Sequence, residues 1–189
     1  RIRYLNFLIL FLTVNVSAEY KITVLATNIS NYGGFGEWSF SALYESDEES
    51  VLFDTGFHED TVLHNAKVLN KDLSKVNKVV LSHFHSDHTG GLIKLRQVYK
   101  ELNPDAFSEV YVARGFFDQR YFKDGSMEGP GNYKDSSKFK KAAEEEGINF
   151  IILDDFKKIS NNLYATGTVT RVVEKYNGPK GFYLDKDLT

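Results

Sequence analysis

Alternating hydrophobic and polar positions predict three strands in the first part of the chain. A loop rich in glycine and asparagine over 28–36 and an acidic turn over 45–49 separate the candidate segments. Because the acidic turn is short, the second and third strands are expected to pair in antiparallel fashion. The three predicted strands cover residues 20–27, 38–44 and 50–53.

Strand and helix patterns alternate over the rest of the chain. Helices are predicted over 59–70, 92–102 and 136–146, and strands over 78–81, 109–113, 149–153, 163–166 and 169–173, with one more element beginning at 181–184. Antiparallel strands followed by alternating strands and helices favour an α/β domain, in which helices cover the outer face of a mixed sheet. Residues 115–134 carry four glycines and five aromatic residues with little regular pattern, and they predict either a lid or a surface loop with aromatic anchors.

Composition indicates one globular domain over residues 19–189. The 189-residue chain is 42% hydrophobic and 14% aromatic, which is enough apolar material for a single core. It has no cysteine, so no disulfide stabilises the fold. The formal net charge is −3 and no long basic stretch is present, so no nucleic acid partner is expected.

The first 18 residues have the pattern of a secretory signal peptide. Arg1 and Arg3 form a basic start, residues 5–14 are almost wholly apolar, and small residues lead to a cleavage site after Ala18. The alternative is a membrane anchor, but the apolar run is shorter than the roughly 20 residues that span a bilayer. We therefore expect export to a periplasm or the exterior, with no stable membrane anchor after cleavage. Since the chain starts with arginine and Thr189 interrupts an element, a partial sequence is expected.

A histidine cluster at a strand-to-helix turn gives the clearest chemical signal. Three of the five histidines, His83, His85 and His88, lie within six residues, which is hard to attribute to chance. His83 and His85 are two apart on an extended segment, so they point to the same side and can hold one metal ion. Asp87 and His88 can serve a second ion beside it. Imidazole with carboxylate suits Zn²⁺, Fe²⁺ or Mn²⁺; the alternative is a group of solvated loop histidines.

Residues 79–92, Val-Val-Leu-Ser-His-Phe-His-Ser-Asp-His-Thr-Gly-Gly-Leu, resemble the signature of the metallo-β-lactamase-fold hydrolases. Residues 52–56, Leu-Phe-Asp-Thr-Gly, look like the first motif of that superfamily. The resemblance implies an αββα sandwich, with two stacked sheets, helices outside and metals at one edge. This chain would supply the N-terminal half to two-thirds of that sandwich.

The resemblance also implies a function. It predicts a metal-dependent hydrolase with two divalent metal ions, zinc or else iron or manganese, which uses a metal-activated water on an ester, lactone, amide or phosphoester of a small-molecule substrate. His83, His85, Asp87 and His88 would be metal ligands, Asp87 would also orient the nucleophile, and Asp54 would support the metal-binding turn through hydrogen bonds. The predicted substrate-binding residues are Asn28, Glu37, Trp38 and Arg171.

Other interpretations stay open. Looser matches over 24–28, 36–45 and 165–171 resemble the dihydropterin ribofuranosyl-aminobenzene phosphate synthase subgroup, which implies a synthase or transferase alternative. No histidine follows His88, so the remaining family ligands are expected beyond Thr189. A chain that truly ends there would instead be a non-catalytic metal-binding module. An oxygen-reducing diiron relative would carry glutamate at position 85, so His85 favours a hydrolase.

Overall fold

The computed structural model describes residues 19–169 and 183–184. The predicted signal peptide (1–18), Arg171 and most of the strand predicted over 169–173 lie outside the described residues. None of the helices in the described part of the chain has the length and apolar character that crossing a bilayer requires.

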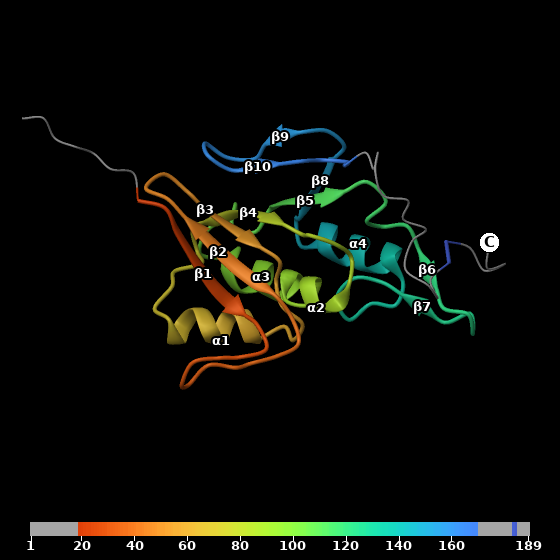
Figure 1. The fold of residues 1–189 in the computed structure, drawn as a ribbon, viewed down its shortest axis with the longest axis horizontal. Coiled ribbons are helices and arrows are strands. Elements are labelled where there is room, and N and C mark those ends of the chain that lie inside the picture. The colour runs from red at the N-terminus through yellow and green to blue at the C-terminus, as the bar shows by residue number, and fades with distance from the viewer. Residues whose placement is uncertain (1–18, 170–182, 185–189) are drawn as a thin grey trace, which may run out of the picture.

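A six-stranded mixed sheet forms the centre of the molecule (Figure 1). The first three strands pair in antiparallel fashion, and every later strand of the sheet lies parallel to its neighbour. The antiparallel start followed by strand–helix alternation is thus confirmed. In spatial order the strands are β1 (Lys21–Ala26), β2 (Ser41–Glu45), β3 (Ser50–Phe53), β4 (Val76–Val80), β5 (Glu109–Ala113) and β8 (Asn149–Leu153).

The second strand begins later than its pattern predicts. Residues 38–40 belong to the connection before β2, although the alternation of hydrophobic residues continues through them. The Trp38 side chain is 78% exposed, and the Phe40 amide donates to the carbonyl of Asp87 rather than to β1. In this segment, a backbone hydrogen bond to the turn that carries the three clustered histidines therefore takes the place of pairing with β1.

Three helices cover one face of the sheet (Figure 1). They are α1 (Thr61–Val68), α3 (Leu92–Tyr99) and α4 (Ser136–Glu145). Each helix has a short apolar stripe that packs against inward-facing strand residues, as expected for amphipathic helices. The fully buried members of this core include Val62, Leu92, Leu95 and Phe139 from the helices and Leu43, Leu52, Val79 and Val110 from the strands.

The opposite face of the sheet is covered only in part by the described residues. A short antiparallel pair, β9 (Lys157–Lys158) and β10 (Tyr164–Ala165), lies over it, and Ile159 beside this pair packs against Tyr111 and Leu153 (Figure 1). Farther along the same sheet, Ile22, Val24 and Phe53 are 72%, 45% and 40% exposed. Within residues 19–169 and 183–184, the second layer therefore consists of the β9–β10 pair.

The glycine-rich segment over 115–134 is more regular than its sequence predicts. It contains a small hairpin of β6 (Arg120–Tyr121) and β7 (Met127–Glu128), and Phe116 is buried in the main core. The Gly131 amide donates to Thr89 Oγ1 at 2.7 Å, and the Arg120 guanidinium lies 4.2 Å from the ring centre of Phe84. The segment is thus held in place by aromatic packing and lies directly beside the turn that carries the three clustered histidines.

Arg96 of α3 joins three segments beneath the sheet. Its side chain is 7% exposed, and the guanidinium donates to the carbonyls of Glu146, Pro104 and Ala106 at 2.6–3.0 Å. Arg96→Met would leave these carbonyls without their charged donor, so we expect the free energy of unfolding to fall by about 2 kcal/mol. Urea denaturation measures this loss.

Arg114 provides the control for this prediction. Its side chain is 72% exposed and pairs with Asp154 at the surface, so Arg114→Met should change the free energy of unfolding by less than about 0.5 kcal/mol. Equal losses in the two variants would contradict the role given to Arg96.

Candidate metal centre

The histidines lie on the turn that follows β4, hereafter the metal loop (residues 82–91). β4 ends at Val80, the backbone stays extended at His85, and the short helix α2 (Ser86–Thr89) begins directly afterwards. The neighbouring parallel strand β3 ends at Phe53, and the amide of the next residue, Asp54, donates to the carbonyl of Val80. The carboxyl ends of these two strands therefore lie together, as is common for ligand sites in α/β sheets.

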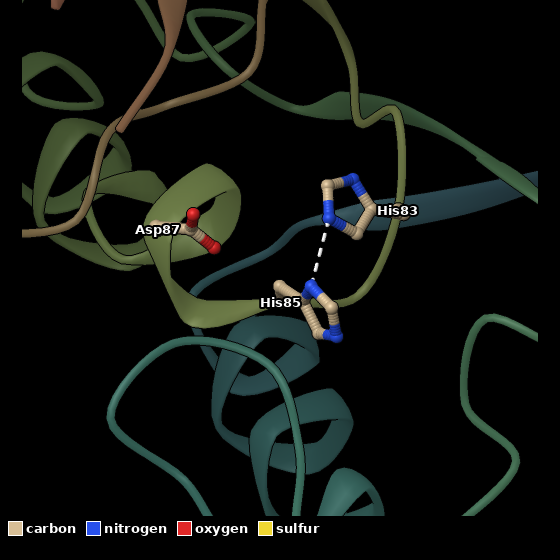
Figure 2. A group of neighbouring side chains, drawn as sticks. All are labelled: His83, His85 and Asp87. Atoms are coloured by element: carbon tan, nitrogen blue, oxygen red, sulfur yellow. Dashed lines mark hydrogen bonds between the residues drawn. The ribbon is translucent and has the colours of Figure 1, made fainter. Parts of the chain in front are cut away.

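His83, His85 and Asp87 form a compact donor group (Figure 2). One ligand atom of each side chain lies within 4.8 Å of the others, and all three residues are partly buried. His83 Nε2 is 3.0 Å from His85 Nδ1. Metal–ligand bonds of about 2.1 Å place the donor atoms of one ion roughly 3.5 Å apart at tetrahedral angles. Two imidazoles and a carboxylate at this spacing fit a divalent ion such as Zn²⁺, Fe²⁺ or Mn²⁺.

His88 lies beside this group and is oriented by Asp54. Its Nδ1 is 2.7 Å from Asp54 Oδ2, and its Nε2 is 3.6 Å from Asp87 Oδ2. Since a carboxylate oxygen accepts the Nδ1 proton, Nε2 is left with its lone pair on the side of Asp87. The structure thus brings Asp87 and His88 together at a second position next to the His83–His85 pair.

Asp54 is held rigidly in its place below the metal loop. Its side chain is 1% exposed, and it accepts hydrogen bonds from the amide and the hydroxyl of Ser82 at 2.7 and 2.8 Å. Burial raises the pKa of its carboxyl above the ordinary value, although the hydrogen bonds from Ser82 and His88 oppose that rise. Its backbone φ of 55° lies in the left-handed region that residues other than glycine seldom adopt.

Ser82 is a participant that the sequence reasoning missed. Its hydroxyl donates to Asp54 Oδ2 and lies 2.9 Å from His83 Nδ1, so it connects the Asp54 carboxylate to the ring of His83. The only sequence signal is its position, between the end of the apolar strand and the first histidine. A serine in that place is common enough that no role follows from the pattern alone.

Among the described residues, those predicted to bind substrate lie outside the donor group. Asn28 and Trp38 are exposed, and Arg171 lies outside the described residues. The Glu37 carboxylate accepts its hydrogen bonds from the protein itself, at the turn after β3. A substrate-binding role for Asn28, Trp38 and Arg171 stays a prediction.

The environment of His83 favours the neutral imidazole that binds metals. Burial and then the neighbouring rings of His88 and His85 lower the pKa of His83 from 6.5 to about 4, although Asp87 acts in the opposite direction. Because the unfolded chain then binds more protons between about pH 4 and 6.5, the metal-free protein should become more stable as pH rises through that window.

Urea denaturation of the metal-free protein at several pH values between 4 and 6.5 tests this expectation. His83→Ala removes the group, so the free energy of unfolding of the variant should rise less steeply with pH than that of the wild type. Parallel pH profiles for the two proteins would show that His83 is not held neutral by the fold.

Comparisons with known proteins agree with this geometry. Residues 39–103 match the family model described as the metallo-beta-lactamase superfamily, a span that contains both Asp54 and the whole metal loop. The crystal structure of Tm1679, a metal-dependent hydrolase of the beta-lactamase superfamily, superposes with a TM-score of 0.54 and 29% identity. That alignment covers 77% of this chain and 47% of Tm1679. The chain has the metallo-β-lactamase fold.

Two curated relatives come from Methanocaldococcus jannaschii. A 7,8-dihydropterin-6-methyl-4-(beta-D-ribofuranosyl)-aminobenzene-5'-phosphate synthase is 23% identical in an alignment 156 positions long, which covers 79% of this chain and 50% of the synthase. An uncharacterized protein of the same organism is 35% identical over 71 residues, 38% of this chain and 27% of that protein. The similarity that the sequence motifs predict, to the metallo-β-lactamase superfamily and to its dihydropterin synthase subgroup, is therefore confirmed. The chain spans about half the length, or less, of these relatives.

Proposed function

We propose that the protein is a metal-dependent hydrolase that acts on an ester, lactone, amide or phosphoester bond of a small molecule. The observation that carries the proposal is the donor group of His83, His85 and Asp87, with its ligand atoms within 4.8 Å at the carboxyl ends of two parallel strands. The similarity to a metal-dependent hydrolase of the same fold supports it.

In this proposal the chain supplies ligands for two divalent ions, zinc or else iron or manganese. His83 and His85 hold the first ion, and His88 faces the second. The Asp87 carboxylate lies within 4.8 Å of the His83–His85 pair and 3.6 Å from His88 Nε2, so it can serve both ions. Asp54 keeps the Nδ1 proton of His88 in place, so Nε2 remains free to bind. Bound divalent ions supply Lewis acidity and an activated water for attack on the substrate.

The activity screen uses the full-length protein loaded separately with Zn²⁺, Mn²⁺ and Fe²⁺ and assayed against lactones, phosphodiesters and β-lactams. We expect hydrolysis of at least one class, loss of that hydrolysis with a chelator, and recovery on adding the ion back. His85→Ala is the inactive control, because it removes one imidazole of the first position. If no metal form hydrolyses any of these substrates, the proposal is contradicted.

A synthase activity is the second candidate, and the similarity to the dihydropterin synthase favours it. The same metal centre would then serve bond formation rather than hydrolysis. Mass spectrometry separates the two candidates in reactions that contain a 4-(beta-D-ribofuranosyl)-aminobenzene-5'-phosphate and a dihydropterin with a leaving group on its 6-methyl carbon. A synthase joins the two into a heavier conjugate and releases the leaving group, whereas a hydrolase adds water to one reactant and yields two fragments. Detection of the conjugate without hydrolysis of any tested substrate would favour the synthase.

A further inference from the structure

The Glu37 carboxylate joins two segments that are distant in sequence. Its Oε1 accepts from the Phe57 amide at 2.7 Å and the Ser39 hydroxyl at 2.6 Å. Its Oε2 accepts from the His58 amide at 3.1 Å and the Thr61 hydroxyl at 2.8 Å. A carboxylate has about four acceptor positions, and protein donors take four here. Glu37 therefore ties the connection before β2 to the turn after β3.

Both joined segments hold the metal loop by its backbone. In the first segment (residues 37–40), the Phe40 amide donates to the carbonyl of Asp87 at 3.3 Å. In the second segment (residues 54–58), the Thr55 amide donates to the carbonyl of His88 at 2.7 Å, and the Gly56 carbonyl accepts from the Gly90 amide at 2.9 Å. Each segment thus determines where a predicted metal ligand lies.

The two segments also touch each other tightly at Glu37. The Gly56 amide donates to the carbonyl of Phe40 at 3.1 Å. A Cβ atom placed on Gly56 would lie 2.8 Å from Glu37 Oε1, so the carboxylate packs directly against this backbone. Burial raises the pKa of Glu37, but the hydrogen bonds from Ser39, Phe57, Thr61 and His58 outweigh it and leave that pKa below its ordinary value. The group is therefore ionised at neutral pH.

We propose that Glu37 is a positioning residue of the metal centre. By holding the first and second segments at one separation, its carboxylate determines the relative positions of Asp87 and His88, without itself binding the ion. The proposal rests on the metal binding proposed above. It also replaces the prediction that Glu37 contacts substrate, because the protein uses all of its acceptor positions.

Glu37→Gln is the direct test, since the side chains have the same shape. In either orientation of the amide, its NH₂ group faces the amide of Phe57 or of His58, where a hydrogen-bond acceptor is needed. Co²⁺ reports both affinity and geometry through its visible absorption spectrum. We expect the Kd for Co²⁺ of the full-length variant to rise about 10- to 100-fold, as for other residues that act through a ligand, with shifted absorption bands.

Asp135→Ala is the matched control. Asp135 is also a carboxylate at a turn, and it caps α4 by accepting from the amides of Ser137 and Lys138. Its loss should lower the urea midpoint of unfolding, but the Co²⁺ affinity and spectrum should stay those of the wild type. This control separates a change at the metal loop from general destabilisation.

The outcomes distinguish the two proposals. A wild-type protein that binds no Co²⁺ would overturn the proposed metal centre itself. If the wild type binds Co²⁺ and Glu37→Gln binds it equally well with the same bands, only the positioning role is overturned. Equal weakening in Glu37→Gln and Asp135→Ala would also overturn it, because the effect would then follow stability alone.

Discussion

His83→Ala and Asp87→Ala are each expected to lose the bound divalent ion. The donor group consists of two imidazoles and one carboxylate within 4.8 Å, so either change leaves two ligands where three had converged. Removing a direct ligand costs more than removing a residue that supports one, for which 10- to 100-fold is typical. We therefore expect metal affinity to fall by more than about 100-fold, measured by elemental analysis after dialysis and by native mass spectrometry.

His58→Ala is the control for this experiment. His58 is also an imidazole and follows Asp54 by four positions, but its ring packs against the ring of Phe57 and it is not part of the donor group. Its replacement should leave the metal content at the wild-type value. Unchanged metal content in both His83→Ala and Asp87→Ala would refute the assignment of the cluster as a metal centre.

Gly90→Ala is expected to destabilise the protein most among the single changes considered. A Cβ atom at position 90 would lie 1.8 Å from the carbonyl oxygen of Phe57 and 2.6 Å from its carbon. Both are backbone atoms, so no side chain can move aside and the metal loop must separate from the turn after β3. We expect the free energy of unfolding to fall by about 4 kcal/mol, measured by urea denaturation.

The same variant should bind metal more weakly, because the displaced backbone includes the Gly90–Gly56 hydrogen bond next to His88. Gly125→Ala is the control: nothing lies within 4 Å of its Cβ position, but its φ is 79°. That change should cost only about 1 kcal/mol of backbone strain and leave metal binding intact. A Gly90→Ala protein as stable as Gly125→Ala would contradict the close packing described for the metal loop.

The parts of the fold predicted well are those whose signals are local. The strands Ser50–Phe53, Glu109–Ala113 and Asn149–Leu153 have the predicted bounds, because short runs of β-branched and aromatic residues lie between clear turn signals. The fold class follows from the order of these elements. The start of β2 was predicted wrongly, because the alternation continues into residues whose backbone bonds the metal loop instead.

The same difference between local signals and distant contacts applies to the candidate site. His83, His85, Asp87 and His88 are close in sequence, so their spacing alone predicts that they lie together. The residues that hold these side chains in place are harder to predict, because their hydrogen-bond partners lie far away along the chain. Glu37 reaches Thr61 across 24 positions, and Thr55 reaches the carbonyl of His88 across 33. No local pattern in the sequence predicts such pairs, because the two residues come into contact only when the sheet has assembled.

The order of strands in the sheet has a consequence for biogenesis. Neighbours in space follow the order of the chain from β1 to β5, with β8 last. A nascent chain leaving the ribosome can therefore add each strand to the edge of the preceding one, without waiting for a distant partner. Asp54 and the whole metal loop precede residue 92, so we expect cation capture to become possible during translation, once β4 has joined the growing sheet.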